Sequence, residues 1–218
     1  MMAKPTTVNE FFVQSLATDN TLTVKQQQII LAAVELFAAK GFDHTTTSDI
    51  ATKAGVAEGT VYKRYKTKRD ILEEIMRRFV RDVVPQAAHE FVNDEWTNSH
   101  GGLHQFLVEL IGNRVDFIVA NFPFIKIMAS EALSNAEMRN QVLSKIGVQA
   151  MGAILPHLQE LRKQKQIVDW PDDMLIQFVV ATMISLALRL IVDLPVADIE
   201  QQKTYMVSFL ERGLAVQK

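Results

Sequence analysis

Residues 41–68 read GFDHTTTSDIATKAGVAEGTVYKRYKTK, and this stretch decides the fold. It predicts two short helices joined by a tight turn. Thr46 is placed to cap the first helix, and Asp49 completes a capping box three residues later. Gly55 supplies the left-handed residue that the turn requires. The pattern therefore predicts a helix-turn-helix within residues 46–65.

The second short helix of this motif has an apolar face and a polar face. Val61 and Tyr65 stand four residues apart, so we expect both to point inward. Thr60, Lys63 and Arg64 lie on the opposite side. A helix this short is not stable alone in water and needs neighbours to brace it. Its hydroxyl, ammonium and guanidinium groups are the ones that contact phosphates and guanine edges in DNA.

Basic side chains are concentrated in the same region. The whole chain has a net charge of −2, but between residues 24 and 81 eleven basic residues outnumber seven acidic ones. Between residues 82 and 218 eleven basic residues face sixteen acidic ones. This distribution favours a polyanion at one end of the protein; the alternative is a solvated, lysine-rich turn. Five bases and no acid fall within residues 60–69: Lys63, Arg64, Lys66, Lys68 and Arg69.

Helical periodicity continues along the rest of the chain, and strand signals are missing. Near the N-terminus, the apolar residues Val8, Phe11, Phe12 and Leu16 predict either a docking helix or a loose arm. We expect further helices over residues 23–40, 67–91 (interrupted or kinked at Pro85), 103–120, 124–133, 136–163, 171–193 and after Pro195. The prediction is an all-α protein with an N-terminal extension at 1–22, a three-helix DNA-binding domain at 23–82 and a larger helical domain at 83–218.

Composition and motifs exclude several classes of protein. Hydrophobic residues make up 48% of the chain and charged residues 22%, as in ordinary soluble proteins. Cysteine is absent, which excludes disulfides, zinc fingers and thiol catalysis. No catalytic, cofactor or metal-binding motif is present, so we expect neither an enzyme nor a cofactor. The uncharged run from Met174 to Leu188 is shorter than the ~20 residues of a membrane span and predicts a buried helix. Without an apolar leader, the protein is expected in the cytoplasm.

Taken together, these residues resemble the TetR family of bacterial repressors. The matching positions are Ile29-Ile-x-Ala-Ala-x-x-Leu-Phe37, Ile50-Ala51, Ala54-Gly55-Val56, Gly59-Thr60-Val61-Tyr62, Tyr65 and Lys68. The resemblance implies an all-helical fold, a two-fold dimer and a ligand chamber, so residues 83–218 are expected to form an effector-binding and dimerisation domain. It also implies that double-stranded operator DNA is contacted by Thr45, Thr46, Thr47, Ser48, Ala57, Glu58, Gly59, Thr60, Tyr62, Lys63, Arg64 and Lys68.

The chain departs from the family pattern at three of these positions. Ala57 stands where the family usually has a capping serine, which removes an N-cap worth roughly 1 kcal/mol. Glu58 replaces a usual base, so direct reading of guanine there is in doubt, although a glutamate accepts a hydrogen bond from cytosine N4. Ser48 often is arginine in relatives, which weakens one phosphate or base contact.

The apolar helix over residues 171–193 points to self-association. One side is expected to pack on its own domain and the other on a second copy, with the last helix completing a four-helix interface. The alternative is a core helix of a monomer. The expected interface residues are Phe178, Ala181, Ser185, Leu188, Met206, Phe209 and Leu210.

A stripe on the helix over residues 103–120 is apolar except for Arg114 and Asn121. In relatives the corresponding helix lines the chamber, so these two are candidates to orient a polar or anionic ligand. The alternative is that Arg114 reaches water or pairs with a carboxylate such as Glu131. The expected effector site comprises Arg114, Phe117, Asn121, Met128 and Glu131.

The predicted function is that of a ligand-responsive repressor that binds a palindromic operator as a homodimer, with an effector that the sequence does not identify. The alternative is a TetR-like activator or adaptor that acts mainly through a protein partner. A helical enzyme is a third hypothesis, for which the sequence offers no catalytic constellation.

Overall fold

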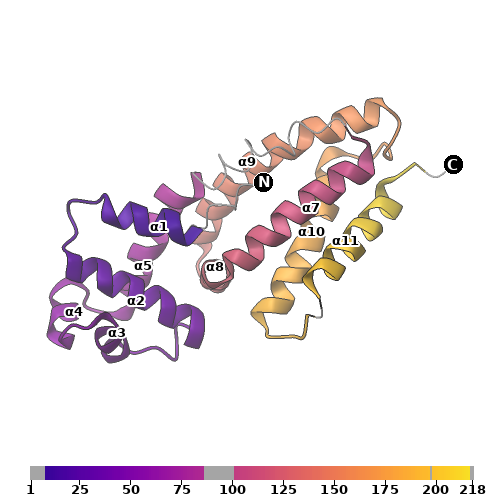
Figure 1. The fold of residues 1–218 in the computed structure, drawn as a ribbon. Helices are drawn as coiled ribbons and strands as arrows, with labels where there is room; N and C mark the ends of the chain where they lie inside the picture. Colours follow the sequence, from indigo (N-terminus) through magenta and orange to yellow (C-terminus); the bar gives the residue numbers. More distant parts are fainter. Residues whose placement is uncertain (1–7, 86–100, 197, 217–218) are drawn as a thin grey trace. The chain divides into compact units, whose positions relative to one another are not determined.

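The computed structural model of the chain describes residues 8–85, 101–196 and 198–216, and these are almost entirely helical (Figure 1). Within them the only β-type contact is an isolated bridge between Ile167 and Ala215. The N-terminal elements are α1 (Val8–Ala17), α2 (Val24–Lys40), α3 (Thr47–Ala54), α4 (Glu58–Arg64), α5 (Lys68–Arg78) and the π-helical turn η1 (Phe79–Val83). They are followed by α7 (Leu103–Ala120), α8 (Phe122–Ser134), α9 (Ala136–Lys163), α10 (Asp172–Ile191) and α11 (Ile199–Leu214).

The all-α prediction is confirmed, and two of the differences in helix boundaries occur near a proline. The helix expected over residues 67–91 changes to a π-helical turn at Phe79, ahead of Pro85, and its predicted continuation to residue 91 lies outside the described residues. Helix α8 begins at Phe122 rather than Phe124. Pro123 fits in its first turn because the amide that proline lacks has no partner within a helix there.

The helices group into two compact units, whose bounds differ from the expected domain limits. Unit 1 contains the described residues up to 85 together with 121–146, and unit 2 contains 101–120 together with 147–196 and 198–216. Helix α8 and the start of α9 therefore belong with the helix-turn-helix, although the sequence placed them in the C-terminal domain.

Helix α1 is a docked part of unit 1 and not a loose arm. Its four apolar residues predicted to cluster are all buried. The Val8 backbone amide donates a hydrogen bond to Asn121 Oδ1 over 2.6 Å, which satisfies one of the helix's first amides. Near its other end, Gln27 Nε2 on α2 donates to the Leu16 carbonyl over 2.8 Å. Both ends of α1 are thus fixed to other elements of the unit.

Contacts across a long stretch of sequence hold α8 in unit 1. The ring of Phe124 lies 5.2 Å from that of Phe12 and 5.8 Å from that of Phe79, centroid to centroid. Arg69 on α5 donates to both carboxylate oxygens of Glu131, with Nη1 3.0 Å from Oε2. Because Glu131 is almost completely buried, this bidentate ion pair neutralises a charge that would be costly to bury alone.

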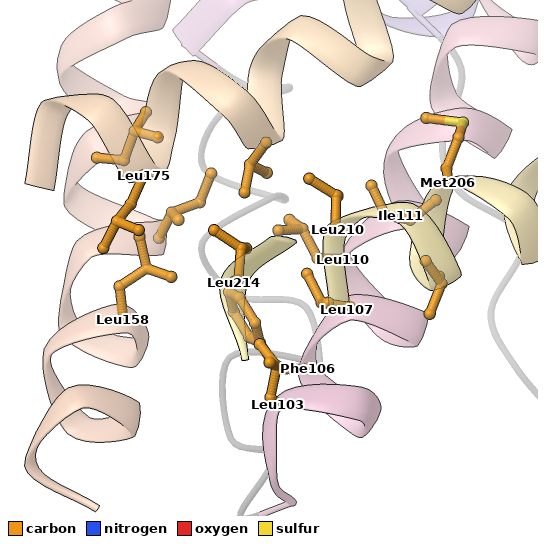
Figure 2. Packing of buried hydrophobic residues seen from close by; sticks show 14 of the residues in the cluster. Leu103, Phe106, Leu107, Leu110, Ile111, Leu158, Leu175, Met206, Leu210 and Leu214 are labelled. Atoms are coloured by element: carbon orange, nitrogen blue, oxygen red, sulfur yellow. The ribbon is translucent and has the colours of Figure 1, made fainter. Parts of the chain in front are cut away.

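Unit 2 is built around α7, α10 and α11, which pack against one another (Figure 1). Figure 2 shows how leucine, isoleucine and phenylalanine side chains of α7 converge with residues of α10, α11 and the end of α9. The labelled residues of this core are Leu103, Phe106, Leu107, Leu110, Ile111, Leu158, Leu175, Met206, Leu210 and Leu214.

Helix α10 is covered by its own chain on one side, as expected, and its other side is exposed in this chain. Leu175, Val179 and Leu186 are buried, but Phe178 and Leu188 are exposed. Helix α10 has 20 residues, and its most apolar 18-residue stretch has a mean hydropathy of 2.1. Of that stretch, 22% is buried. By length and composition alone, α10 could therefore span a bilayer. A single such helix is weak evidence for a membrane, because helices that pack between protein surfaces have the same composition.

Candidate nucleic-acid interface

Side-chain caps define the first helix of the motif as predicted. The Asp49 amide donates to Thr46 Oγ1 over 3.0 Å, and the Thr46 amide donates to Asp49 Oδ2 over 3.0 Å. The Thr46 backbone amide, then the Thr46 side chain, with a smaller contribution from Lys40, hold the pKa of the Asp49 carboxyl below its ordinary value. Gly55 ends α3 at φ 68° and ψ 31°, in the left-handed region. The Val56 amide then donates back to the Ala51 carbonyl over 3.0 Å and closes the turn.

Helix α4 is held by its apolar face and lacks a side-chain cap. Val61 and Tyr65 are both buried, as the spacing predicted. Ala57 occupies the N-cap position and makes no side-chain hydrogen bond there, which matches the expected loss of a cap. The burial of Val61 and Tyr65 therefore has to supply the bracing that this seven-residue helix needs.

The opposite face of α4 carries polar groups to the surface. Tyr62 is 50% exposed, and Lys63 and Arg64 are exposed beside it. Thr60 is half-buried. Of the other predicted DNA contacts, Thr46, Ser48, Ala57, Glu58 and Gly59 are exposed and Thr47 is half-buried.

A hydrogen-bonded triad connects the start of α3 with α4. Thr47 Oγ1 on α3 lies 2.9 Å from the Tyr62 hydroxyl and 3.2 Å from Glu58 Oε1, both on α4. These contacts join residues eleven and fifteen positions apart in the chain. The sequence motif identified all three residues separately, but their contact depends on the angle at which α3 and α4 cross.

Two predicted DNA contacts have structural partners instead. Thr45 is 0% exposed, and its Oγ1 donates to the Gly41 carbonyl over 2.8 Å at the end of α2. This corrects the expected contact from the Thr45 side chain, since its hydroxyl satisfies a carbonyl that α2 leaves open. Lys68 Nζ donates to the carbonyls of Phe42 and Asp43 over 2.8 and 3.0 Å and lies 4.5 Å from the centre of the Phe42 ring. Lys68 therefore ties α5 to the loop before α3.

A buried charge network that sequence reasoning missed lies near Tyr65. Arg78 on α5 donates to Asp19 Oδ2 over 2.8 Å and to Glu74 Oε1 over 2.7 Å. Burial raises the pKa of the nearby Tyr65 hydroxyl, and the charge of Glu74 raises it further. Arg78 and Asp19 are 59 positions apart, so no local spacing in the sequence signals their contact.

The candidate effector residues fall in both units. In unit 2, Arg114 and Phe117 are half-buried, and the Arg114 guanidinium lies 5.0 Å from the Phe117 ring centre. Arg114 Nε also donates to Asn113 Oδ1 over 2.7 Å. In unit 1, Asn121 and Glu131 are buried and accept hydrogen bonds from α1 and α5, as described above. Met128 is half-buried on α8. The carboxylate of Glu131 is bonded to Arg69, a partner that the sequence did not indicate.

The candidate interface residues divide into a surface group and a core group. Exposed on α10 and α11 are Phe178, Ala181, Ser185, Leu188 and Phe209, with Phe209 67% and Leu188 55% exposed. Met206 and Leu210 are buried in the core of unit 2 (Figure 2). The expectation for these two is corrected, because they face α7 of their own chain and not the surface.

Comparison with known proteins agrees with the fold and the motif. Residues 29–75 match the family model of bacterial regulatory proteins, tetR family. The fatty acid metabolism regulator protein of Bacillus subtilis (strain 168) is 47% identical over 53 residues, which are 24% of this chain and 27% of that protein. The chain thus matches about a quarter of that relative's length.

Solved structures resemble the chain over most of its length. The transcriptional regulator FadR from Bacillus subtilis, in complex with stearoyl-CoA, is 22% identical with a TM-score of 0.61 and covers 85% of this chain and 97% of its own. The ketosteroid transcriptional regulator KstR2 of Mycobacterium tuberculosis is 17% identical with a TM-score of 0.62 and covers 87% and 94%. These likenesses extend the shared fold beyond the matched motif, and all three proteins are named as regulators, none as an enzyme.

Proposed function

We propose that this chain, whose residues 29–75 belong to the TetR family of bacterial regulatory proteins, is a ligand-responsive repressor that binds a palindromic operator as a homodimer. The observation that carries the proposal is the division of α4 into two faces. Val61 and Tyr65 are buried, while Tyr62, Lys63 and Arg64 are exposed. A braced helix with cationic and hydroxyl groups on its free side is suited to the major groove of DNA.

The charge of the motif supports binding to a polyanion. Lys63, Arg64 and Lys66 are exposed bases around the end of α4, and contacts of such bases with phosphates release counterions from DNA. Binding should therefore weaken as the salt concentration rises. The alternative of a solvated, lysine-rich turn predicts no selective binding.

An exposed apolar surface on unit 2 supports the homodimer. Phe178, Ile184 and Leu188 on α10 and Tyr205 and Phe209 on α11 are large apolar or aromatic side chains that this chain leaves in solvent. Burying such a surface against a second copy removes it from water, at roughly 25 cal/mol per Å² of apolar area. A dimer also has two helix-turn-helix motifs, which can bind half-sites ~34–36 Å apart, about one turn of DNA.

The relatives suggest the class of effector. FadR was crystallised with stearoyl-CoA and KstR2 is named for ketosteroids, so we propose a largely apolar ligand. Arg114 and Phe117 of α7 are the candidate contacts, because a guanidinium pairs strongly with the phosphate groups of an acyl-CoA. The ligand changes DNA binding only if it binds the DNA-competent and DNA-incompetent arrangements with different affinity.

The DNA-binding proposal is tested by fluorescence anisotropy with a duplex from upstream of the chain's own gene. Wild-type affinity should fall steeply between about 50 and 200 mM salt. Lys63→Glu and Arg64→Glu should each weaken binding and lower the salt slope by about two, one phosphate contact per subunit. Lys163→Glu is the matched control, an exposed lysine of unit 2. Equal binding by wild type, Lys63→Glu and Lys163→Glu would contradict the proposal.

Self-association is tested by sedimentation. Leu188→Lys and Phe209→Lys should shift the protein from dimer to monomer, whereas Val13→Lys, an apolar surface position of unit 1, should not. A wild-type monomer at micromolar concentration would contradict the dimer.

The effector class is tested by adding stearoyl-CoA to the protein–DNA complex. It should release the DNA from wild type and release less from Arg114→Gln, with ligand-free affinity unchanged. An unaffected wild-type complex would contradict an acyl-CoA effector.

A further inference from the structure

We propose that Glu58 and Tyr62 read a cytosine in each operator half-site, through a surface of hydrogen-bond acceptors that Thr47 fixes. The inference rests on the proposed function, because it assumes that α4 enters the major groove. It adds one base of the operator and the residues that select it.

The direction of the hydrogen bonds in the triad follows from what each group can donate. A glutamate carboxylate has no proton to donate and can only accept. The contact between Thr47 Oγ1 and Glu58 Oε1, 3.2 Å long, therefore uses the single proton of the Thr47 hydroxyl. The 2.9 Å contact between Thr47 and Tyr62 must then use the proton of the Tyr62 phenol. The protons run from Tyr62 to Thr47 to Glu58.

This direction determines what the triad offers to a ligand. The proton of the Tyr62 phenol is occupied, so its oxygen has only lone pairs left for other partners. The carboxylate of Glu58 likewise presents lone pairs and a negative charge. Both side chains are exposed, so these two side chains offer acceptors alone. Phosphate oxygens are themselves acceptors, and the carboxylate repels them, so the triad is unsuited to the DNA backbone.

Among the four bases, cytosine fits an acceptor surface best. In the major groove cytosine presents the N4 amino group, which is a donor. Adenine has a donor at N6 but an acceptor beside it at N7, guanine has acceptors at N7 and O6, and thymine has an acceptor and a methyl group. Lys63 and Arg64, exposed on the same helix, supply the donors that suit phosphates and guanine. Helix α4 thus has separate acceptor and donor groups, and the acceptor group selects cytosine.

To test this, bound duplexes are selected from a random library with the full-length protein, and the affinity of the protein for each selected sequence is then measured. Wild type should select cytosine at one position of each half-site, and changing that base should weaken binding about tenfold or more. Glu58→Gln has an amide that both donates and accepts, so its preference should move toward adenine. Thr47→Val keeps every charge but releases the Tyr62 proton, so the preference for cytosine should fall.

Glu73→Gln is the matched control, since it removes one exposed carboxylate from α5 of the same unit. It should keep the wild-type base preference. The inference is overturned if Glu58→Gln and Glu73→Gln select the same bases, or if wild type selects sites without the cytosine. Failure of wild type to select any sequence is a different result and overturns the proposed function itself. A purely structural role for Thr47 would change stability in thermal melts but not the selected base.

Discussion

Helix α1 should be essential for the stability of unit 1, and Phe12→Ala tests this most directly. The Phe12 ring is 0% exposed and packs 5.2 Å from that of Phe124, which in turn stacks 5.8 Å from Phe79. Truncating a fully buried phenylalanine costs about 3–5 kcal/mol, from lost transfer energy and from the cavity that remains. If α1 undocks as one element while the rest of the unit stays folded, the loss of stability cannot exceed the free energy with which α1 docks.

Val13→Ala is the matched control, since Val13 lies on the same helix and is 41% exposed. Surface changes of this kind alter stability by about 0.5 kcal/mol or less. Urea unfolding gives the change in stability, and native-state hydrogen exchange of the amides in α1 and α2 distinguishes local undocking from unfolding of the unit. If Phe12→Ala shifts the urea midpoint no more than Val13→Ala, the docked position of α1 is wrong.

Three further perturbations test local features of unit 1. Tyr65→Phe should leave stability unchanged or raise it by about 1–2 kcal/mol, because within the described structure the Tyr65 hydroxyl is buried without a hydrogen-bond partner. A clear decrease in the free energy of unfolding, measured with urea, would contradict this and indicate that the hydroxyl has a partner. Gly55→Ala should lower the stability of the fold by about 1–2 kcal/mol and Gly55→Asn by less, because φ at this position is +68° and asparagine tolerates the left-handed region better than alanine. A clash is not the reason, since no described atom lies within 4 Å of an added Cβ. Equal melting temperatures for both variants would refute backbone strain as the cause. Hydrogen bonds from the hydroxyl and amide of Thr21, then from Arg78, hold the pKa of Asp19 below its ordinary value. A carboxylate with a lowered pKa stabilises the fold above its unfolded pKa, so this stability should be lost as the pH falls below about 4. Urea midpoints between about pH 6 and pH 3 should therefore fall less for Asp19→Asn than for wild type, and parallel curves would contradict the role of Asp19.

The features that the sequence determined by itself are local. Thr46 caps α3 and Gly55 ends it because the interacting groups are at most four residues apart, so residue type and spacing are sufficient. The same holds for the inward face of α4, where Val61 and Tyr65 follow the helical period. The fold class followed from this periodicity over the whole chain, and so did most of the helix boundaries.

Only the tertiary structure decided which of these elements share a core and which polar groups remain available. Thr45 matched the motif but is buried, and Lys68 matched it but is bonded to two backbone carbonyls of the loop before α3. Glu131 was a candidate ligand contact and instead pairs with Arg69, 62 positions away. Helix α10 is apolar on every face, yet only one face is covered by its own chain. In each case the deciding contact joins segments far apart in sequence, and a helical period constrains the face of a helix but not the partner that covers it.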